Sequence, residues 1–169
     1  MNLPLARART YAEKIVRELT PYCSRIQVAG SIRRGRPTCH DIDLVCIPSD
    51  LAGLRARVQA AAQQELCCGE QVFRTVLKTG VQLDVYFAHS GAGDLLRKEP
   101  SNWGTLLLCR TGSKEHNIRL ARKAAQLGMR WEPHRGVVAG PDLDVIASET
   151  EADVFRALKM DFVEPERRD

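Results

Sequence analysis

The sequence predicts a mixed α/β protein, because segments with apolar residues at helical spacing alternate with short segments in which apolar and polar residues alternate. The clearest strand covers residues 41–47, where apolar residues alternate with two aspartates. A hairpin is predicted around Thr79-Gly80, and an apolar stripe over residues 3–19 indicates a long helix. Together these observations indicate a sheet with helices packed against it.

The chain of 169 residues suffices for one good core or for two small lobes. Hydrophobic residues make up 44% and charged residues 27%, which argues against disorder. The sequence has no signal peptide and no apolar run of about 18 residues, so we expect no membrane association. Six cysteines without a Cys-x-x-Cys pair argue against a disulfide framework. We therefore expect an intracellular protein, cytoplasmic or, in a eukaryote, nuclear.

The net charge is only +4, but the basic residues form two runs that each contain only two acidic residues. Two positive patches suit a polyanion such as nucleic acid, and the alternative is a pair of solvated helix faces. The runs consist of Arg7, Arg9, Lys14, Arg17, Arg25, Arg33, Arg34 and Arg36, and of Arg110, Lys114, Arg119, Arg122, Lys123, Arg130 and Arg135.

The first part of the chain is predicted to alternate helices and strands. Pro21 ends the first helix and Pro48 ends the aspartate-containing strand, while Asp50 is a good N-cap for a helix rich in Ala, Gln and Leu. The expected elements are a helix at 3–19, strands at 25–29 and 41–47, a helix at 50–66, and hairpin strands at 72–78 and 81–88.

The second part is predicted to consist of helices and one small hairpin. Ser113 is a credible N-cap for a helix that ends before Gly128, and Ser148 to Glu151 read as a capping box before a last helix. The expected elements are helices at 103–108 and 114–127, hairpin strands at 129–131 and 137–139, and a helix at 152–158.

Asp41 and Asp43 carry the first chemical signal. Successive strand side chains point to opposite faces, so both carboxylates share one face, about 6.5–7 Å apart. Two adjacent carboxylates repel, and a divalent cation with a preference for oxygen ligands, Mg²⁺ or Mn²⁺, would stabilise both as anions. The alternative is a pair of solvated aspartates on an edge strand.

The segment just before this strand carries groups that suit a phosphate. Gly30 and Ser31 offer backbone N–H groups and a hydroxyl, and Arg33 and Arg34 offer guanidinium groups. A phosphate-binding loop that leads into a pair of metal-binding carboxylates is the arrangement that nucleotidyl transfer requires.

The pattern Gly-Ser-x-Arg-Arg before Asp-x-Asp resembles the nucleotidyltransferase superfamily of DNA polymerase beta, and closely the X-family DNA polymerases. In that family the Gly-Ser pair also lies eleven positions before the first catalytic Asp. The resemblance implies that Asp41, Asp43 and a third carboxylate, Asp84 on a later strand, are catalytic and hold two Mg²⁺ ions, for which Mn²⁺ can substitute. Asp94 is the next candidate for the third carboxylate. The resemblance assigns nucleotide binding to Gly30, Ser31, Arg34 and His40, where His40 replaces the usual glycine.

A second block resembles the family further along the chain. Thr111, Gly112 and Ser113 match its Thr-Gly-Ser turn, and Asn117 lies where the family has an Asn that contacts the nucleotide. Two departures are visible: Cys109-Arg110 replaces a pair of aromatic residues, and Ala121 replaces an Arg that supports the template base. Residues that flank Ala121 are expected to bind DNA in part in its place, namely Arg119, Arg122 and Lys123.

The resemblance implies an α/β (α+β) nucleotidyltransferase palm at residues 1–105, with a mixed sheet and packed helices. A small helix and hairpin lobe at 106–169 would bind the nucleotide and template. We expect a minimal form without the family's lyase and helix-hairpin-helix lobes, acting as a monomer.

The expected function is DNA-directed addition of dNTPs to a primer 3′ end, in short-gap filling during DNA repair. One alternative is a non-polymerase or template-independent nucleotidyltransferase that acts on a small molecule, a protein or an RNA end. Another is an inert nucleic-acid-binding module. Three carboxylates argue against the inert module, because acidic residues weaken binding to a phosphate backbone.

Overall fold

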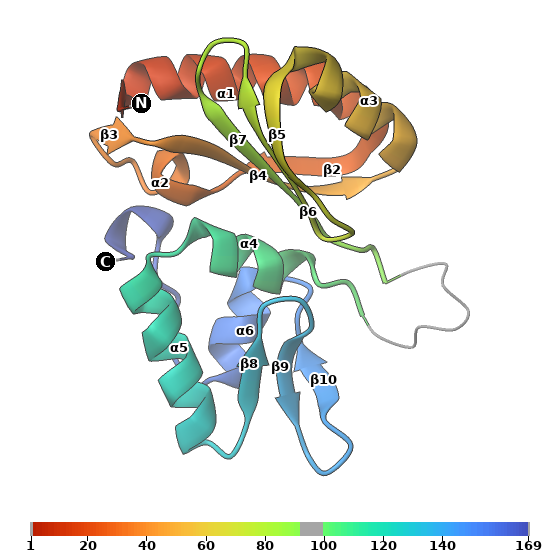
Figure 1. Ribbon diagram of the computed structural model, residues 1–169. Helices are drawn as coiled ribbons and strands as arrows, with labels where there is room; N and C mark the ends of the chain where they lie inside the picture. Colours follow the sequence, from red (N-terminus) through yellow and green to blue (C-terminus); the bar gives the residue numbers. More distant parts are fainter. Residues whose placement is uncertain (1, 92–99, 169) are drawn as a thin grey trace. The chain divides into compact units, whose positions relative to one another are not determined.

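A computed structural model describes residues 2–91 and 100–168. The chain forms two compact units, residues 1–87 and 88–169, each drawn with its helices and strands in Figure 1. The predicted palm boundary at residue 105 lies inside a helix, α4 (Trp103–Thr111), while the units divide at residue 87. Asp94, the reserve candidate for the third carboxylate, lies outside the described residues.

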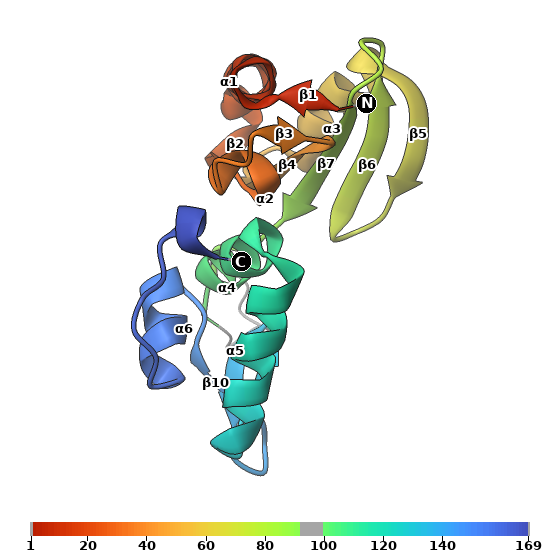
Figure 2. The ribbon, with the colours of Figure 1, turned by 90° about the vertical axis from the view of Figure 1, so that its left-hand side faces the viewer.

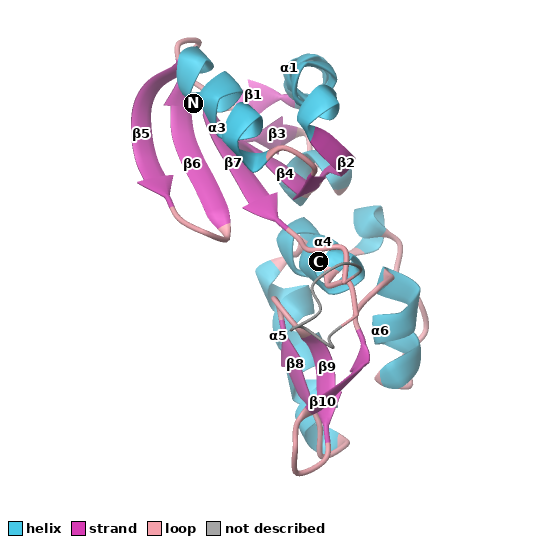
Figure 3. Cartoon of the chain, turned by 90° about the vertical axis from the view of Figure 1, so that its right-hand side faces the viewer, coloured by secondary structure: helices cyan, strands magenta, loops and turns pink. Residues whose placement is uncertain are grey.

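The first unit is built on a mixed five-stranded sheet, which confirms the predicted fold class (Figure 3). The two central strands, β4 and β7, run parallel, and every other neighbouring pair is antiparallel. In spatial order the strands are β2 (Cys23–Val28), β4 (Asp41–Pro48), β7 (Gln82–Phe87), β6 (Val72–Leu77) and β5 (Ala62–Cys68).

Two helices, α1 (Leu5–Leu19) and α3 (Leu51–Ala61), lie on the same face of this sheet (Figure 3). Their apolar residues join one core with the inward-facing residues of β4 and β7, among them Ile42 and Leu83. The aspartates of β4 and β7 therefore project from the opposite face of the sheet. The short elements of this unit are β1 (Leu3–Pro4), which pairs with β3 (Thr38–Cys39), the 3-10 turn η1 (Thr20–Tyr22) and α2 (Gly30–Arg33).

The predicted helix at 50–66 is correct only in its first part. Asp50 caps α3 by accepting a hydrogen bond from the Gly53 N–H at 2.8 Å, but the helix ends at Ala61. Residues 62–68 form β5 instead, at the outer edge of the sheet, as Figure 2 shows. Glutamine and glutamate favour a helix locally. Here the backbone pairing with β6 overrides that preference, and most β5 side chains are exposed, so no period-two pattern marks the strand.

The second unit consists of helices around a small antiparallel sheet. Ser113 caps α5, because its hydroxyl accepts a hydrogen bond from the His116 N–H at 3.2 Å, as predicted. The strand β10 is absent from the sequence prediction, because only one of its four residues is buried. Besides α4, the elements are α5 (Lys114–Gln126), β8 (Arg130–Glu132), β9 (Gly136–Ala139), β10 (Asp144–Ala147), α6 (Glu151–Ala157) and η2 (Pro165–Arg167).

The predicted capping box at Ser148 is wrong, because the residue that caps the helix lies two positions later. Helix α6 is capped by Thr150, which has an extended backbone and accepts a hydrogen bond from the Asp153 N–H at 3.0 Å. Ser148 lies before the helix, where its carbonyl accepts a hydrogen bond from the Thr105 N–H at 2.9 Å.

The C-terminal segment is held by one buried arginine. Arg168 donates to Glu151 Oε1 at 2.7 Å and to the Val163 carbonyl at 2.8 Å. Its guanidinium also lies 5.6 Å from the ring centre of Phe155 and 5.5 Å from that of Phe162. Since the Arg168 side chain is fully buried, this single residue ties the end of the chain to α6.

We expect Arg168→Met to destabilise the second unit by about 3–5 kcal/mol, because it leaves the Glu151 carboxylate buried without its partner. Both tryptophans of the chain, Trp103 and Trp131, lie in this unit, so their fluorescence during urea unfolding reports on it directly. The control is Arg156→Met, which breaks an exposed pair with Asp153 and should cost no more than about 1 kcal/mol. Equal losses in the two variants would contradict the role given to Arg168.

The stability of the second unit is also expected to depend on pH through His116. Burial, followed by the charges of Arg168 and Arg119, lowers the pKa of this imidazole to about 4, against the opposing effect of Glu151. The unfolded chain binds a proton at His116 more readily than the folded chain does, so protonation favours unfolding. Stability should therefore fall as the pH drops from about 6.5 towards 4. In His116→Phe this part of the pH dependence should disappear; a parallel loss in both proteins would show that other groups cause it.

Candidate functional site

Three carboxylates meet on the open face of the first unit's sheet. Asp41 and Asp43 are two residues apart on β4, and Asp43 is the direct partner of Asp84 on the parallel strand β7. Directly paired residues of neighbouring strands project to the same face. The structure therefore brings together the three aspartates that the sequence had suggested from two distant segments.

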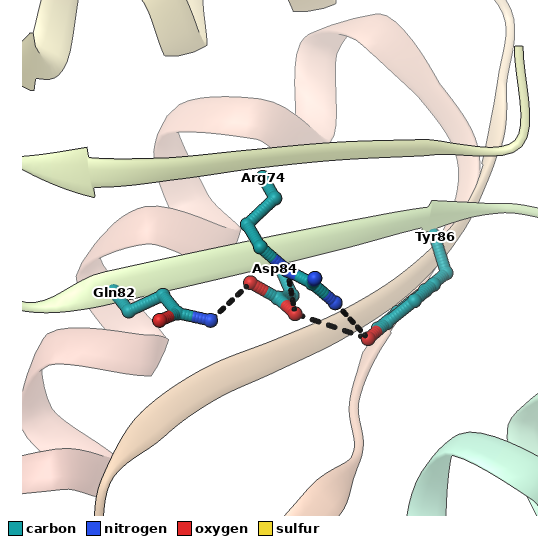
Figure 4. A network of polar contacts seen from close by, with 4 residues as sticks. All are labelled: Arg74, Gln82, Asp84 and Tyr86. Atoms are coloured by element: carbon teal, nitrogen blue, oxygen red, sulfur yellow. Dashed lines mark hydrogen bonds and ion pairs between the residues drawn. The ribbon is translucent and has the colours of Figure 1, made fainter. Parts of the chain in front are cut away.

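Asp84 is fixed by a network of hydrogen bonds (Figure 4). Arg74 Nε donates to its Oδ2 at 2.7 Å, the Tyr86 hydroxyl donates to the same oxygen at 3.1 Å, and Gln82 Nε2 donates to Oδ1 at 2.9 Å. The Asp84 side chain is only 3% exposed. The hydrogen bond from Arg74 to this carboxylate raises the pKa of Arg74, so the guanidinium is held in its charged form.

Arg74 was missed by the sequence analysis. A two-residue turn at Thr79-Gly80 would place Thr75 opposite Asp84, whereas the register in the structure is shifted by one residue and pairs Arg74 with Asp84. An arginine opposite the buried aspartate of such a hairpin supplies the counter-charge that a buried carboxylate requires.

Asp41 responds to the same electrostatic field. Burial and then the charge of Asp84 raise the pKa of Asp41, while His40 and Arg74 partly oppose this shift. Among the described residues, no three His, Cys, Asp or Glu side chains converge closely enough to form a ready-made metal site. The three carboxylates thus share one face and interact, but the Asp84 carboxylate is directed towards Arg74.

The predicted phosphate loop is attached to β4 by close contacts. The Ala29 N–H donates to the Asp43 carbonyl at 2.8 Å, and a Cβ atom placed on Gly30 would overlap the Asp43 carboxylate. Gly30 has a φ of +59°, a left-handed conformation that glycine adopts without strain. Only glycine therefore lets the loop approach the aspartate this closely.

Two further groups of this loop suit an anionic ligand. The Ser31 hydroxyl is buried and has no hydrogen-bond partner among the described residues, which is costly unless a ligand or water satisfies it. Burial and then Arg36 lower the pKa of Arg34, whereas Asp43 raises it, so this guanidinium lies within the field of the carboxylates. Hard carboxylate oxygens beside a tight glycine loop and an unsatisfied hydroxyl fit a divalent cation with a phosphate.

The nucleotide-binding residues predicted in the second unit gather between α4 and α5. Thr111 is fully buried, and Gly112 ends α4 with a φ of +68°. Asn117 Nδ2 donates to the Cys109 carbonyl at 2.8 Å, and its buried Oδ1 has no partner among the described residues. The Ser113 hydroxyl already accepts a hydrogen bond as the helix cap. Among these residues, Asn117 therefore has most of the polar atoms that could still bond to a ligand.

The predicted DNA-binding residues also come together. Arg119, Arg122 and Lys123 line one surface pocket, and Lys159, from the segment after α6, joins them. His40, by contrast, is exposed next to Asp41 and belongs to the first unit.

Comparison with known protein families finds a match for one part of the chain. A family model described as DNA polymerase beta thumb matches residues 106–169. This match supports an X-family polymerase-like relation for that segment. Comparison with curated proteins finds no match. No helix within residues 2–91 and 100–168 is long and apolar enough to cross a membrane.

We expect Gly30→Ala to destabilise the first unit by about 2–5 kcal/mol, because the new methyl group adds steric overlap with Asp43 to the strain of a left-handed backbone. Gly140→Ala is the control, since Gly140 has a φ of +77° with no atom within 4 Å of an added Cβ. That variant measures backbone strain alone, about 1–2 kcal/mol. Hydrogen exchange of the β4 and β7 amides would locate the loss. A cost at Gly30 no larger than at Gly140 would show that Asp43 readily moves aside.

Proposed function

We propose that the protein is a DNA-directed DNA polymerase that transfers nucleotides to a primer 3′ end, filling short gaps during DNA repair. The observation that carries the proposal is the parallel pairing of β4 with β7, which sets Asp41, Asp43 and Asp84 on one face beside the Gly30–Ser31 loop. The thumb match over residues 106–169 suggests a DNA polymerase-like function at the family level.

The carboxylates of Asp41, Asp43 and Asp84 would hold two Mg²⁺ ions, for which Mn²⁺ can substitute. When bound, such ions neutralise charge on the transferred phosphate and lower the pKa of the attacking hydroxyl. The chain's own contribution is to hold three acidic groups on one face of two paired strands. Arg74 supports this, because its hydrogen bond to Asp84 fixes the position of that carboxylate.

Asp84 would also accept the proton of the primer 3′-hydroxyl. Its Oδ2 atom is oriented by Arg74 and Tyr86, so the carboxylate cannot rotate freely. A general base must be held in a defined position within hydrogen-bond reach of its substrate. These hydrogen bonds support a defined position for the Asp84 carboxylate.

The Gly30–Ser31 loop and Arg34 would bind the β- and γ-phosphates of the incoming dNTP. The Ser31 hydroxyl can donate one hydrogen bond, and the Arg34 guanidinium can form a charge-assisted fork. The close approach at Gly30 keeps these donors next to the carboxylates. Binding of the phosphates would satisfy the Ser31 hydroxyl, which is otherwise buried without a partner.

In the second unit, Thr111, Gly112, Ser113 and Asn117 would contact the sugar and base of the nucleotide. Asn117 Nδ2 carries a second N–H besides the one donated to Cys109. A minor-groove acceptor of any base pair can receive that hydrogen bond, so the contact would favour a paired base without distinguishing its identity.

Primer extension tests the proposal. We expect the chain to add dNTPs with Mg²⁺ at a one-nucleotide gap opposite a template base, with weaker activity at a simple primer end and none at a nick. Addition without a template base, or no reaction with dNTPs but transfer to a small molecule, a protein or an RNA end, would replace the polymerase by another nucleotidyltransferase.

Asp41→Asn, Asp43→Asn and Asp84→Asn should each reduce the extension rate by several orders of magnitude, because each removes a charge that stabilises the reacting phosphate. Asparagine keeps the size of the side chain and can still accept from Arg74 at position 84, so the fold should survive. The matched control is Asp50→Asn, since asparagine caps a helix as well as aspartate does. Near-normal extension by the Asp84 variant would exclude it as the third carboxylate.

A further inference from the structure

The second unit carries a pocket lined mostly by cations. It has a volume of about 400 Å³ and is lined by Arg119, Arg122, Lys123, Gln126, Lys159 and Met160. Among these described lining residues, four are basic and none is acidic. Positive charge gathered in a concave surface raises the local concentration of anions.

The pocket lies on a different side of α5 from the residue proposed to contact the nucleotide. Residues of an α-helix are about 100° apart, so positions 119, 122, 123 and 126 form one stripe. Asn117 lies about 170° and Ala121 about 150° from the centre of that stripe. The Asn117 side chain is accordingly bonded to Cys109 of α4 and is not part of the pocket. Arg119 and Arg122 therefore face this pocket and not the side of α5 that carries Ala121.

Lys159 provides an independent indication that the pocket has a function. It follows the end of α6 with a φ of +51°, and the Lys159 and Met160 N–H groups close the helix by donating to Arg156 and Phe155 carbonyls, each at 3.0 Å. This left-handed position after a helix selects glycine, because other residues are strained there. A lysine kept in strained backbone at the edge of a cationic pocket points to a use for its side chain.

The dimensions of the pocket favour a polymeric anion over a single ion. Residues 119 to 126 extend about 10 Å along the helix, at 1.5 Å per residue. One strand of duplex DNA presents a phosphate about every 3.4 Å along its axis, so a helix aligned with that axis would pass about three phosphates over this length. Arginine and lysine together provide both forked and point-charge contacts to phosphate oxygens.

We propose that Arg119, Arg122, Lys123 and Lys159 form a backbone-binding site that grips consecutive phosphates of a DNA strand, without reading bases and separately from the nucleotide contact at Asn117. The site deepens the proposed polymerase function and rests on it for the identity of the polyanion.

The decisive variant is Lys159→Gly, which removes the charge and relieves the backbone strain together. We expect its melting temperature to rise by about 2–4 °C, while its affinity for gapped DNA falls about 5- to 10-fold at 0.1 M NaCl. The slope of log affinity against log salt should become shallower by about 0.9. A lysine with a merely structural role cannot give weaker binding together with higher stability.

Two further variants complete the test. Arg122→Gln should weaken DNA binding by a similar factor, whereas Arg156→Gln, an equal change of charge on the exposed side of α6, should leave it within about twofold. Affinity is measured by fluorescence anisotropy of the full chain with a labelled one-nucleotide-gap duplex and no dNTP. Unchanged affinity in Lys159→Gly and Arg122→Gln, or an equal loss in Arg156→Gln, would overturn the site.

The measurement separates this site from the proposed reaction, because it requires no catalysis. A chain that extends primers yet binds DNA equally well with and without Lys159 keeps the polymerase proposal and loses the phosphate site. A chain that binds DNA through Lys159 but never extends a primer keeps the site and loses the polymerase. Binding of phosphatidylserine vesicles, but not of DNA, through the same residues would also overturn the inference.

Discussion

The parallel pairing of β4 with β7 is the constraint on which the first unit depends. Parallel neighbours require a crossover connection, and the segment from α3 through the β5–β6 hairpin supplies it. This crossover brings Asp84, more than forty positions along the chain, into register with Asp43. The apolar partners of both strands face α1 and α3, so burial of the core fixes the face on which the carboxylates lie. A shift of either strand by one residue would turn the aspartates of that strand towards the core.

Holding three carboxylates on one face has consequences for the surrounding residues. Asp84 is buried and is satisfied by three hydrogen-bond donors, of which Arg74 carries the compensating charge. Asp43 is crowded by the loop at Gly30, where any larger residue would overlap it. The mixture of a paired acid, an acid with a raised pKa and an unsatisfied hydroxyl is typical of a ligand-binding region and not of a surface optimised for stability alone.

The second unit presents two different polar surfaces on one helix, α5. Helix α5 directs Asn117 towards α4 and its arginines towards Lys159, while Leu120 and Ala124 bury the side between them. The buried pair of Arg168 and Glu151 ties the end of the chain to α6 behind this arrangement. The segment that matches the DNA polymerase beta thumb includes all of these residues.

The sequence by itself determined the features that depend on neighbouring residues: the strand with Asp41 and Asp43, the hairpin at Thr79-Gly80, and the caps at Asp50 and Ser113. Local periodicity and capping chemistry are sufficient for these. Only the tertiary structure decided that residues 62–68 form a strand, that Arg74 bonds to Asp84 and that Lys159 joins the arginines of α5. Each of these depends on contacts between residues far apart in the chain, where backbone pairing and counter-charge outweigh the preferences of the local sequence.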